Sequence, residues 1–295
     1  MKKNKILSEI GLFYCAAIWG STFILTKAAL DSVHPISMVA IRFLIAAIAL
    51  LPWVMRRKNK LRHLKEGFFL SFFISLLYLT QTTGLVYTTA SNSGFITGLF
   101  IIFIPVFMFI FKKRKPNVLH ITSAFTALFG MWLLTGGVEG FNLGDGLTLI
   151  AAMAYSGHLI VTDKYVKANA DTILLAFHQF WMVALISFTI SWIMGYPMAV
   201  TSMNGWWIII FLAIFPTLTA FYIQMVAQKN SEPFKVGLIF TMEPVFAAMF
   251  AWTLGGEQFM LIKAIGGLCI VSGMIIGEFS KFNLKRAVKK EVLPI

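Results

Sequence analysis

The two halves of the chain carry the same sequence pattern. Residues 98–107 (GLFIIFIPVF) match residues 237–246 (GLIFTMEPVF), with Gly, Leu and the triplet Pro-Val-Phe in register. Trp19 in the first half corresponds to Tyr155 in the second, within two further stretches that align without gaps. Both halves are largely apolar. A repeat of this length predicts a fold assembled from two copies of one helical bundle.

The apolar content predicts that both bundles lie in a lipid bilayer. Of the 295 residues, 58% are hydrophobic and 13% are charged, and the mean hydropathy is +0.81. Short polar stretches divide the chain into runs of about 20 residues, the length that crosses the hydrocarbon core as a helix. We predict an all-α membrane protein with ten spans, at residues 8–28, 36–55, 67–87, 93–111, 118–135, 145–163, 172–194, 205–225, 234–254 and 259–279.

The basic residues predict the orientation of these spans. The net charge of +13 does not indicate nucleic-acid binding, because the positive charges follow the membrane topology. With a cytoplasmic N-terminus, all Lys and Arg residues except Lys27, Arg42 and Lys263 fall in the N-tail, the even-numbered loops or the C-tail. Both termini are then cytoplasmic. Lipid is the expected surrounding partner.

Repeat and span count together predict inverted symmetry. We assign residues 1–137 to the first five-helix repeat and residues 138–295 to the second, which ends in a short basic tail. Because five is odd, the second repeat enters the membrane from the side opposite to the first. Two inverted halves can exchange conformations, which is the geometric basis of alternating access.

Several aromatic residues and prolines are predicted at the middle of the membrane. Trp19, Tyr78 and Tyr155 lie about ten residues into their spans, and Pro105 and Pro244 lie at similar depth. Each proline removes a backbone hydrogen bond, so we expect a helix kink at both positions. Carbonyl groups freed in this way are tolerated only inside the protein or beside a wet cavity. The pattern indicates a central cavity; ordinary aromatic packing is the alternative for Trp19 and Tyr155.

Glu243 is the candidate with the clearest chemistry. A carboxylate at the centre of a bilayer is expensive unless it is paired, protonated or hydrated. We expect Glu243 to bind a substrate amine or to exchange a proton. The alternative is a protonated carboxyl group that hydrogen-bonds a neighbouring helix.

Arg42 and His178 occupy mirrored depths in equivalent spans. Arg42 is a candidate for neutralising a substrate carboxylate, and His178 for titrating during transport. The alternatives are an arginine that reaches outward to the interface and a histidine that is satisfied within the bundle.

Two more polar residues extend the predicted site. His158 lies one turn from Tyr155, and Gln81 follows Tyr78 by three residues, so each shares a helix face with its aromatic neighbour. His158 either lines the same cavity or is a buried histidine satisfied by the bundle. Gln81 extends a polar stripe on its span.

The chain resembles EamA-type members of the drug/metabolite transporter superfamily. Pro35 and Arg42 at the start of the second span contribute to the resemblance. The stretches that carry it are 16–23 (AAIWGSTF), 90–94 (ASNSG), 105–107 (PVF), 243–252 (EPVFAAMFAW), 254–257 (LGGE) and 265–273 (IGGLCIVSG). The resemblance implies ten helices in two inverted repeats, a location in the cytoplasmic membrane of a bacterium, and often export of amino acids, other metabolites or toxic compounds. One departure is visible, because residues 111–115 hold no acidic counterpart of Glu257.

The expected function is secondary transport of a small metabolite, such as an amino acid or a similar amphipathic solute, or of a drug, in the export direction. The sequence has no P-loop, no His-Glu-x-x-His motif and no metal-ligand cluster, so no cofactor, metal or enzymatic activity is expected. The partners are a small-molecule substrate and, for coupling, protons. One chain holds a whole pathway, so a monomer suffices and a homodimer is the alternative. A non-transporting receptor or accessory protein is the competing function.

Overall fold

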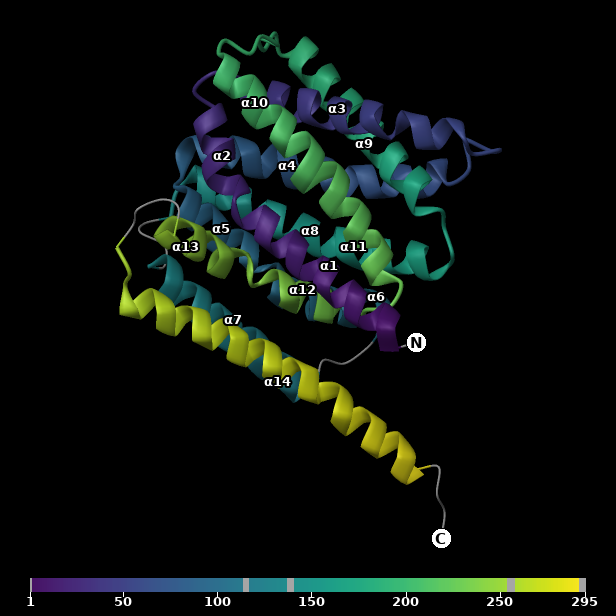
Figure 1. Cartoon of the computed structure of the whole chain (residues 1–295), viewed down its shortest axis with the longest axis vertical. Coiled ribbons are helices and arrows are strands. Elements are labelled where there is room, and N and C mark those ends of the chain that lie inside the picture. The colour runs from purple at the N-terminus through teal and green to yellow at the C-terminus, as the bar shows by residue number, and fades with distance from the viewer. Residues whose placement is uncertain (1, 114–116, 137–140, 254–257, 292–295) are drawn as a thin grey trace.

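The computed structural model describes residues 2–113, 117–136, 141–253 and 258–291. Every regular element in these ranges is a helix. The helices run roughly alongside one another, and the first turn of α1 and the last turn of α14 lie toward the right of Figure 1. The prediction of an all-α protein is therefore confirmed for the described residues.

The first half contains seven helical elements: α1 (Lys2–Gly20), α2 (Thr22–Ala29), α3 (Pro35–Met55), α4 (Leu64–Tyr87), α5 (Ala90–Gly98), α6 (Phe100–Lys112) and α7 (Val118–Thr135). The second half contains eight: α8 (Leu143–Lys167), α9 (Thr172–Ile193), α10 (Met203–Leu212), the π-helix η1 (Ala213–Thr219), α11 (Ala220–Gln228), α12 (Pro233–Phe240), α13 (Glu243–Thr253) and α14 (Leu261–Glu291).

Helical segments of the described chain meet the length and apolarity needed to cross a membrane. Six do so fully: Ile6–Ala29, Pro35–Met55, Leu64–Tyr87, Ala90–Ile110, Thr172–Ile193 and Met203–Gln228. Val118–Leu133 and Leu261–Gly277 are shorter apolar helices. The two other predicted spans correspond to α8, which carries charges near both ends, and to the short pair α12 and α13. The chain is thus a multi-pass membrane protein, while the count of ten spans stays a prediction.

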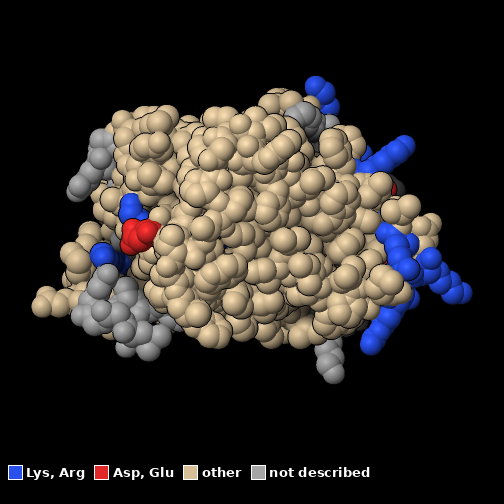
Figure 2. Space-filling view, turned by 90° about the horizontal axis from the view of Figure 1, so that it is seen from above, with Lys and Arg blue, Asp and Glu red and all other residues tan. Residues whose placement is uncertain are grey.

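The surface has the distribution expected of a bilayer protein. Large apolar side chains face outward, among them Trp192 at 84% and Phe72 at 56% exposure. Figure 2 shows a broad middle band without Lys or Arg, and basic side chains that project from one end. We call this the basic end; it carries the exposed residues Arg56, Lys58, Lys60, Arg62, Lys65, Lys164, Lys167 and Lys229. A charge-free band between polar ends is the surface that lipid tails require.

The helices pack as partners drawn from both halves of the chain. α14 lies along α7, α3 packs against α9, and α4 packs against α8 and α9 (Figure 1). α1 crosses the middle of the bundle beside α11, α12 and α13. The main buried cluster lies between these elements and includes Leu12, Phe43, Phe180, Phe221 and Phe240.

A close contact joins α4 to α8 at the end opposite the basic end. A Cβ atom at Gly84 would lie 2.8 Å from the carbonyl oxygen of Gly144, so only glycine permits this approach. Thr88 donates a hydrogen bond from Oγ1 to Asp145 Oδ1 at 2.6 Å. Lys27 donates from Nζ to the carbonyl oxygens of Leu85 and Thr88, the last carbonyls of α4.

Three spans are interrupted at the middle of the bundle. α1 gives way to α2 at Ser21, α5 to α6 at Leu99, and α12 to α13 at residues 241–242. Pro244 follows directly after the last of these interruptions, where it leaves the Phe240 carbonyl without its usual donor. Pro105 lies inside α6, and the interruption falls about a turn and a half earlier, at Leu99.

The interruption between α1 and α2 has no proline. It occurs at the pair Gly20 and Ser21, a common site of helix kinks. The Ser21 hydroxyl donates to the Ile18 carbonyl at 2.7 Å, and the Thr22 hydroxyl donates to the Trp19 carbonyl at 2.8 Å. Side-chain hydroxyls therefore satisfy carbonyls at the kink, as a membrane interior demands.

Gly20 also allows α1 to touch the start of α13. A Cβ atom there would lie 2.6 Å from the carbonyl oxygen of Glu243, too close for any real contact. We predict that Gly20→Ala lowers the free energy of unfolding by about 1–3 kcal/mol, the usual effect of overpacking. Thermal unfolding of the purified protein in detergent measures this. Gly146→Ala is the control, because its Cβ would lie at an ordinary 3.8 Å from Phe141; equal melting temperatures for both variants would contradict the prediction.

Candidate functional site

The interrupted spans surround a small central cavity of about 30 Å³. Its lining comes from six elements: α1, α2, α4, α5, α8 and α11, together with the first residue of α13. The lining residues are Trp19, Thr22, Phe23, Leu77, Tyr78, Gln81, Thr97, Tyr155, Phe221 and Glu243. Five of the six residues predicted to bind substrate are thus brought together, and His158 is not among them.

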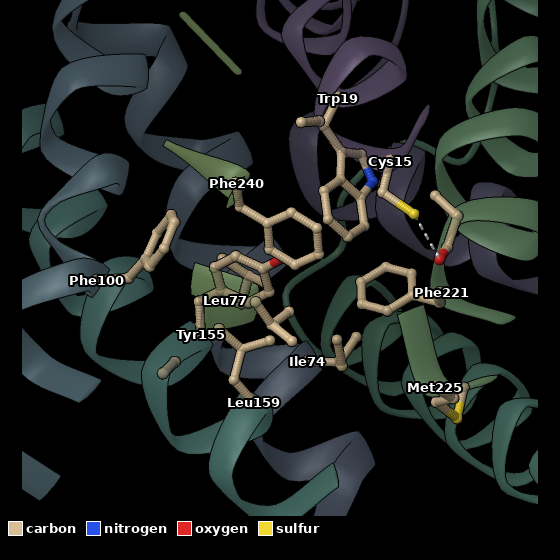
Figure 3. Packing of buried hydrophobic residues seen from close by; sticks show 14 of the residues in the cluster. Cys15, Trp19, Ile74, Leu77, Phe100, Tyr155, Leu159, Phe221, Met225 and Phe240 are labelled. Atoms are coloured by element: carbon tan, nitrogen blue, oxygen red, sulfur yellow. Dashed lines mark hydrogen bonds between the residues drawn. The ribbon is translucent and has the colours of Figure 1, made fainter. Parts of the chain in front are cut away.

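Half of the residues that line the cavity are aromatic. Figure 3 shows three of them, Trp19, Tyr155 and Phe221, packed close to Phe240. Trp19 packs edge-on against Tyr155 at 6.0 Å and against Phe240 at 4.9 Å between ring centroids. Its indole Nε1 donates to the carbonyl of Pro216 at 2.7 Å, which fixes the ring against η1. Phe221 lies 5.5 Å from Trp19 and closes the side toward α11. Rings fixed in this way present flat apolar faces, which bind apolar groups and cations.

Glu243 lies where the central cavity meets a second pocket. This outer pocket has a volume of about 110 Å³ and shares Phe23 and Glu243 with the central cavity. Its other lining residues include Ala90 at the start of α5 and Lys263 near the start of α14, both at the end opposite the basic end. The site therefore connects toward that opposite end.

The Glu243 carboxylate has no hydrogen bond or ion pair with any described residue, although the side chain is only 9% exposed. Tyr155 is 5% exposed, and its hydroxyl also lacks a partner within the described chain. Buried polar groups are nearly always paired, so two unpaired groups facing one cavity call for a partner from outside the protein. Gln81 differs, because its Nε2 donates to Thr97 Oγ1 at 2.9 Å.

Arg42 is buried beside the cavity rather than in its lining. Its guanidinium is 3% exposed, and Nε donates to Thr217 Oγ1 at 2.6 Å. The charged group also stacks 4.6 Å from the centre of the Tyr78 ring and donates weakly to the Tyr78 hydroxyl at 3.4 Å. Tyr78 therefore separates Arg42 from the cavity, and no ion pair of Arg42 with a described acidic residue is present. The guanidinium points into the bundle, not outward to the interface.

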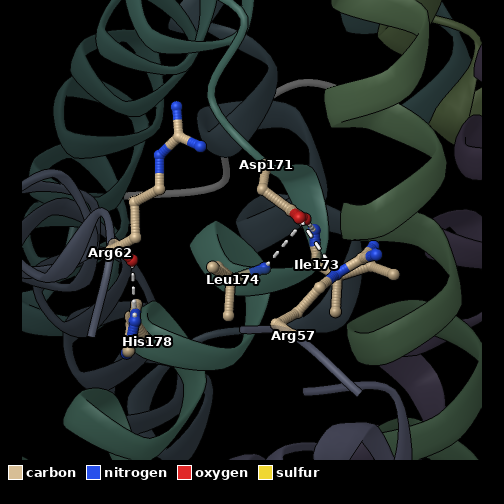
Figure 4. Close-up of polar contacts among 6 residues, drawn as sticks. All are labelled: Arg57, Arg62, Asp171, Ile173, Leu174 and His178. Atoms are coloured by element: carbon tan, nitrogen blue, oxygen red, sulfur yellow. Dashed lines mark hydrogen bonds and ion pairs between the residues drawn. The ribbon is translucent and has the colours of Figure 1, made fainter. Parts of the chain in front are cut away.

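His178 lies away from the cavity, at the basic end (Figure 4). Its Nδ1 accepts a hydrogen bond from Trp181 Nε1 at 3.2 Å, so Nε2 carries the proton and donates to the carbonyl of Arg62 at 3.1 Å. Nearby, the N-cap residue Asp171 accepts hydrogen bonds from two amides of α9 and pairs with Arg57 at 3.0 Å. His178 therefore ties the loop between α3 and α4 to the start of α9.

His158 lies one turn below Tyr155 on α8 and is fully buried. Its Nε2 is 3.1 Å from Gln179 Oε1 and 3.4 Å from Thr162 Oγ1. The ring packs edge-on against Phe221, with 5.6 Å between ring centroids. Glu257, which the sequence comparison singled out, lies outside the described residues.

Sequence reasoning missed five cavity residues and one supporting residue outside the lining. Thr22 and Phe23 belong to the stretch that carries the family resemblance, so their position beside Trp19 was a usable signal. Leu77, Thr97 and Phe221 carry no signal of their own. Thr217 supports Arg42 and directly follows Pro216, which has no N–H to donate to the Leu212 carbonyl; the Thr217 hydroxyl donates to that carbonyl at 2.8 Å.

The Arg42–Thr217 contact generates a stability prediction. Thr217→Val leaves a buried guanidinium donor without its partner, so we expect the free energy of unfolding to fall by about 1–3 kcal/mol beyond the effect of the control. The control is Thr219→Val in the same π-helix, because Thr219 also donates to a carbonyl five residues back, at 2.7 Å, but receives nothing from Arg42. Thermal unfolding of both variants measures the difference; an equal loss would show that the bond to Arg42 contributes nothing.

Comparisons with known proteins identify the family to which this chain belongs. The chain matches the EamA-like transporter family over residues 6–136 and again over residues 142–277. An uncharacterized transporter of Archaeoglobus fulgidus is 30% identical over 92% of this chain and 86% of its own length. The uncharacterized inner membrane transporter YedA of Escherichia coli strain K12 is 27% identical over 96% of this chain and 94% of its own.

A solved crystal structure shows the same fold. It superimposes with a TM-score of 0.77, covers 94% of this chain and 98% of its own, and is 19% identical in sequence. Similarity at that identity concerns the fold, whereas the family match spans both halves of the sequence. The chain is a multi-pass membrane protein and belongs to the EamA-like transporter family.

Proposed function

We propose that the protein is a secondary transporter that exports a small amine-bearing metabolite, such as an amino acid, across the cytoplasmic membrane. The observation that carries this proposal is the unpaired Glu243 carboxylate, which faces both the central cavity and the outer pocket. A substrate ammonium group is the natural partner for a buried carboxylate without a protein cation. The unpaired Tyr155 hydroxyl offers a second polar contact.

The shape of the site favours a metabolite over a drug. Neither the central cavity nor the outer pocket reaches the roughly 300 Å³ typical of sites for drug-sized ligands. Rings of Trp19, Tyr78 and Phe221 provide an apolar surface for the rest of the solute. This combination suits an amphipathic molecule with one amine and a small apolar body.

The proposed mechanism is alternating access between two inverted five-helix repeats. The helix contacts support it, because α4 packs on α8 as α11 packs on α1, and α5 and α6 pack on α8 as α12 and α13 pack on α1. The two stretches that match the family also divide the chain near residue 137. In this scheme the basic end is cytoplasmic and carries both termini, as the distribution of Lys and Arg favours.

Flux measurements in proteoliposomes test the function. Vesicles that contain the purified protein are loaded with a mixture of amino acids and other small amines, and the efflux of each is followed. We expect at least one solute to leave faster than from empty vesicles. We expect Glu243→Gln to reduce that flux at least about tenfold, which corresponds to the loss of roughly 1.4 kcal/mol or more of binding energy.

The matched control is Glu232→Gln. Glu232 is the exposed N-cap residue of α12, on the same span as Glu243, and its side chain forms no cap hydrogen bond. We expect this variant to retain its flux and both variants to fold. Undiminished flux in Glu243→Gln would eliminate the role of this carboxylate. A folded wild-type protein that moves none of the solutes would contradict the proposed substrate class.

A further inference from the structure

A second buried polar cluster lies behind the central cavity, toward the basic end. It consists of His158 and Thr162 on α8, Gln179 on α9, and Gln224 and Gln228 on α11, all with 0% exposure. We call it the inner cluster. We propose that these residues line the substrate pathway when it opens toward the basic end. This inference rests on the proposed transport function and names a site that the cavity residues do not include.

Contacts within the inner cluster leave polar atoms unused. Gln224 Nε2 donates to Gln228 Oε1 at 3.0 Å, and Gln228 Nε2 donates to the carbonyl of Leu159 at 3.0 Å. His158 Nδ1 and Gln224 Oε1 have no hydrogen-bond partner within the described chain. Because an unsatisfied buried polar atom costs about 1–3 kcal/mol, such atoms indicate a second state in which water or solute reaches them.

One aromatic side chain separates the inner cluster from the central cavity. The Phe221 ring packs against Trp19 of the cavity lining at 5.5 Å and against His158 of the inner cluster at 5.6 Å, measured between ring centroids. Figure 3 shows Phe221 between Trp19 and Met225, and Met225 Sδ lies 4.0 Å from Gln179 Nε2. A movement of this ring would remove one barrier between the central cavity and the inner cluster.

The internal repeat explains why the cluster is polar. In the register that aligns Trp19 with Tyr155, the cavity residue Thr22 aligns with His158. Tyr78 and the cavity residue Gln81 on α4 have the same spacing as Phe221 and Gln224 on α11. The open side of the site and the inner cluster are thus built from related positions. In an inverted repeat, the sealed half is the counterpart of the half that is open.

The chemistry of the inner cluster suits release rather than tight binding. Amide, imidazole and hydroxyl groups offer hydrogen bonds, and no cluster member carries a fixed charge. A solute that leaves Glu243 could form hydrogen bonds with the inner cluster in place of those it would form with water. The cluster offers no carboxylate to bind the amine of the solute. Several weak hydrogen bonds of this kind allow a solute to be released toward the basic end.

Cysteine accessibility in membrane vesicles tests the inference. The background carries Cys15→Ala and Cys269→Ala, and its flux is checked first. Gln224→Cys and Thr162→Cys are then exposed, from the basic end only, to a membrane-impermeant methanethiosulfonate cation. Thr162→Cys is included because cysteine is close to threonine in size and therefore disturbs folding least.

Three further cysteines calibrate the labelling. Asn59→Cys in the exposed loop between α3 and α4 reports full access from the basic end, and exposed Asp31→Cys reports leakage to the other side. Ser71→Cys is the matched control, because Ser71 is also buried in the basic half, on α4, but contacts Phe68 and Met182 instead of the cluster. It reports labelling through local unfolding alone.

We expect both cluster cysteines to react at roughly 0.1–10% of the Asn59→Cys rate, the population range of a minor conformer. This rate should exceed that of Ser71→Cys at least about tenfold, since only the cluster lies on the pathway. A bulky maleimide attached at Ser91→Cys, in the outer pocket, should hold that side open and slow the labelling of Gln224→Cys.

Two results would overturn the inference. In the first, both cluster cysteines react as slowly as Ser71→Cys while flux persists and still depends on Glu243; the proposed function would then stand without this pathway. In the second, labelling is fast but indifferent to the maleimide at Ser91→Cys, which would make the cluster a permanent opening. Failure of the proposed function itself would be seen separately, as absent flux in the wild-type protein.

Discussion

The requirement that every backbone polar group be satisfied in a lipid environment shapes the centre of this protein. A continuous helix meets this requirement by itself, whereas an interrupted helix does so only where other groups replace the missing bonds. Here the replacements are local hydroxyls at Ser21, Thr22 and Thr217, and the indole of Trp19 on the Pro216 carbonyl. The interruptions therefore gather in the protein interior, and the cavity forms where they meet.

Electrostatics at the site follow from the same arrangement. α13 begins at Glu243, so the positive end of its helix dipole lies beside the carboxylate. Arg42, a buried cation beside the cavity, is turned toward Thr217 and covered by the Tyr78 ring. The central cavity thus presents one acidic group, Glu243, which has no ion pair with a described residue. This asymmetry supports the proposed amine-bearing substrate.

Much of the fold could be predicted from sequence, because apolar runs and basic loops are direct consequences of the bilayer. The site was predicted in part: depth within a span identified Trp19, Tyr78, Tyr155 and Glu243, since equal depth is necessary for a shared cavity. Depth says nothing of helix rotation, however, so it could not separate these residues from His158. His178 has the same limitation, since its partner Arg62 lies in a loop whose path no periodicity predicts.

The break at Gly20 and Ser21 illustrates another limit. A proline removes a backbone hydrogen bond within its own helix, so its effect can be predicted from the local sequence. Pro244 predicted a helix interruption for that reason. Gly20 has its effect through the Glu243 carbonyl on a helix more than 200 residues away in the chain, which no local pattern can reveal. What a glycine contributes therefore depends on which atoms of another helix pack against it.

The junction of α4 and α8 bears on the proposed motion of the molecule. At the end opposite the basic end, these two helices are joined by the close approach of Gly84 to Gly144 and by the Thr88–Asp145 hydrogen bond. Lys27 also donates a hydrogen bond to a carbonyl at the end of α4. Together these contacts link a helix of the first half of the sequence to a helix of the second half. In the proposed alternating-access mechanism, widening on that side would involve the elements that line the outer pocket, namely α1, α2, α5, α7, α13 and α14. The junction of α4 and α8 would then be the pivot of the proposed motion.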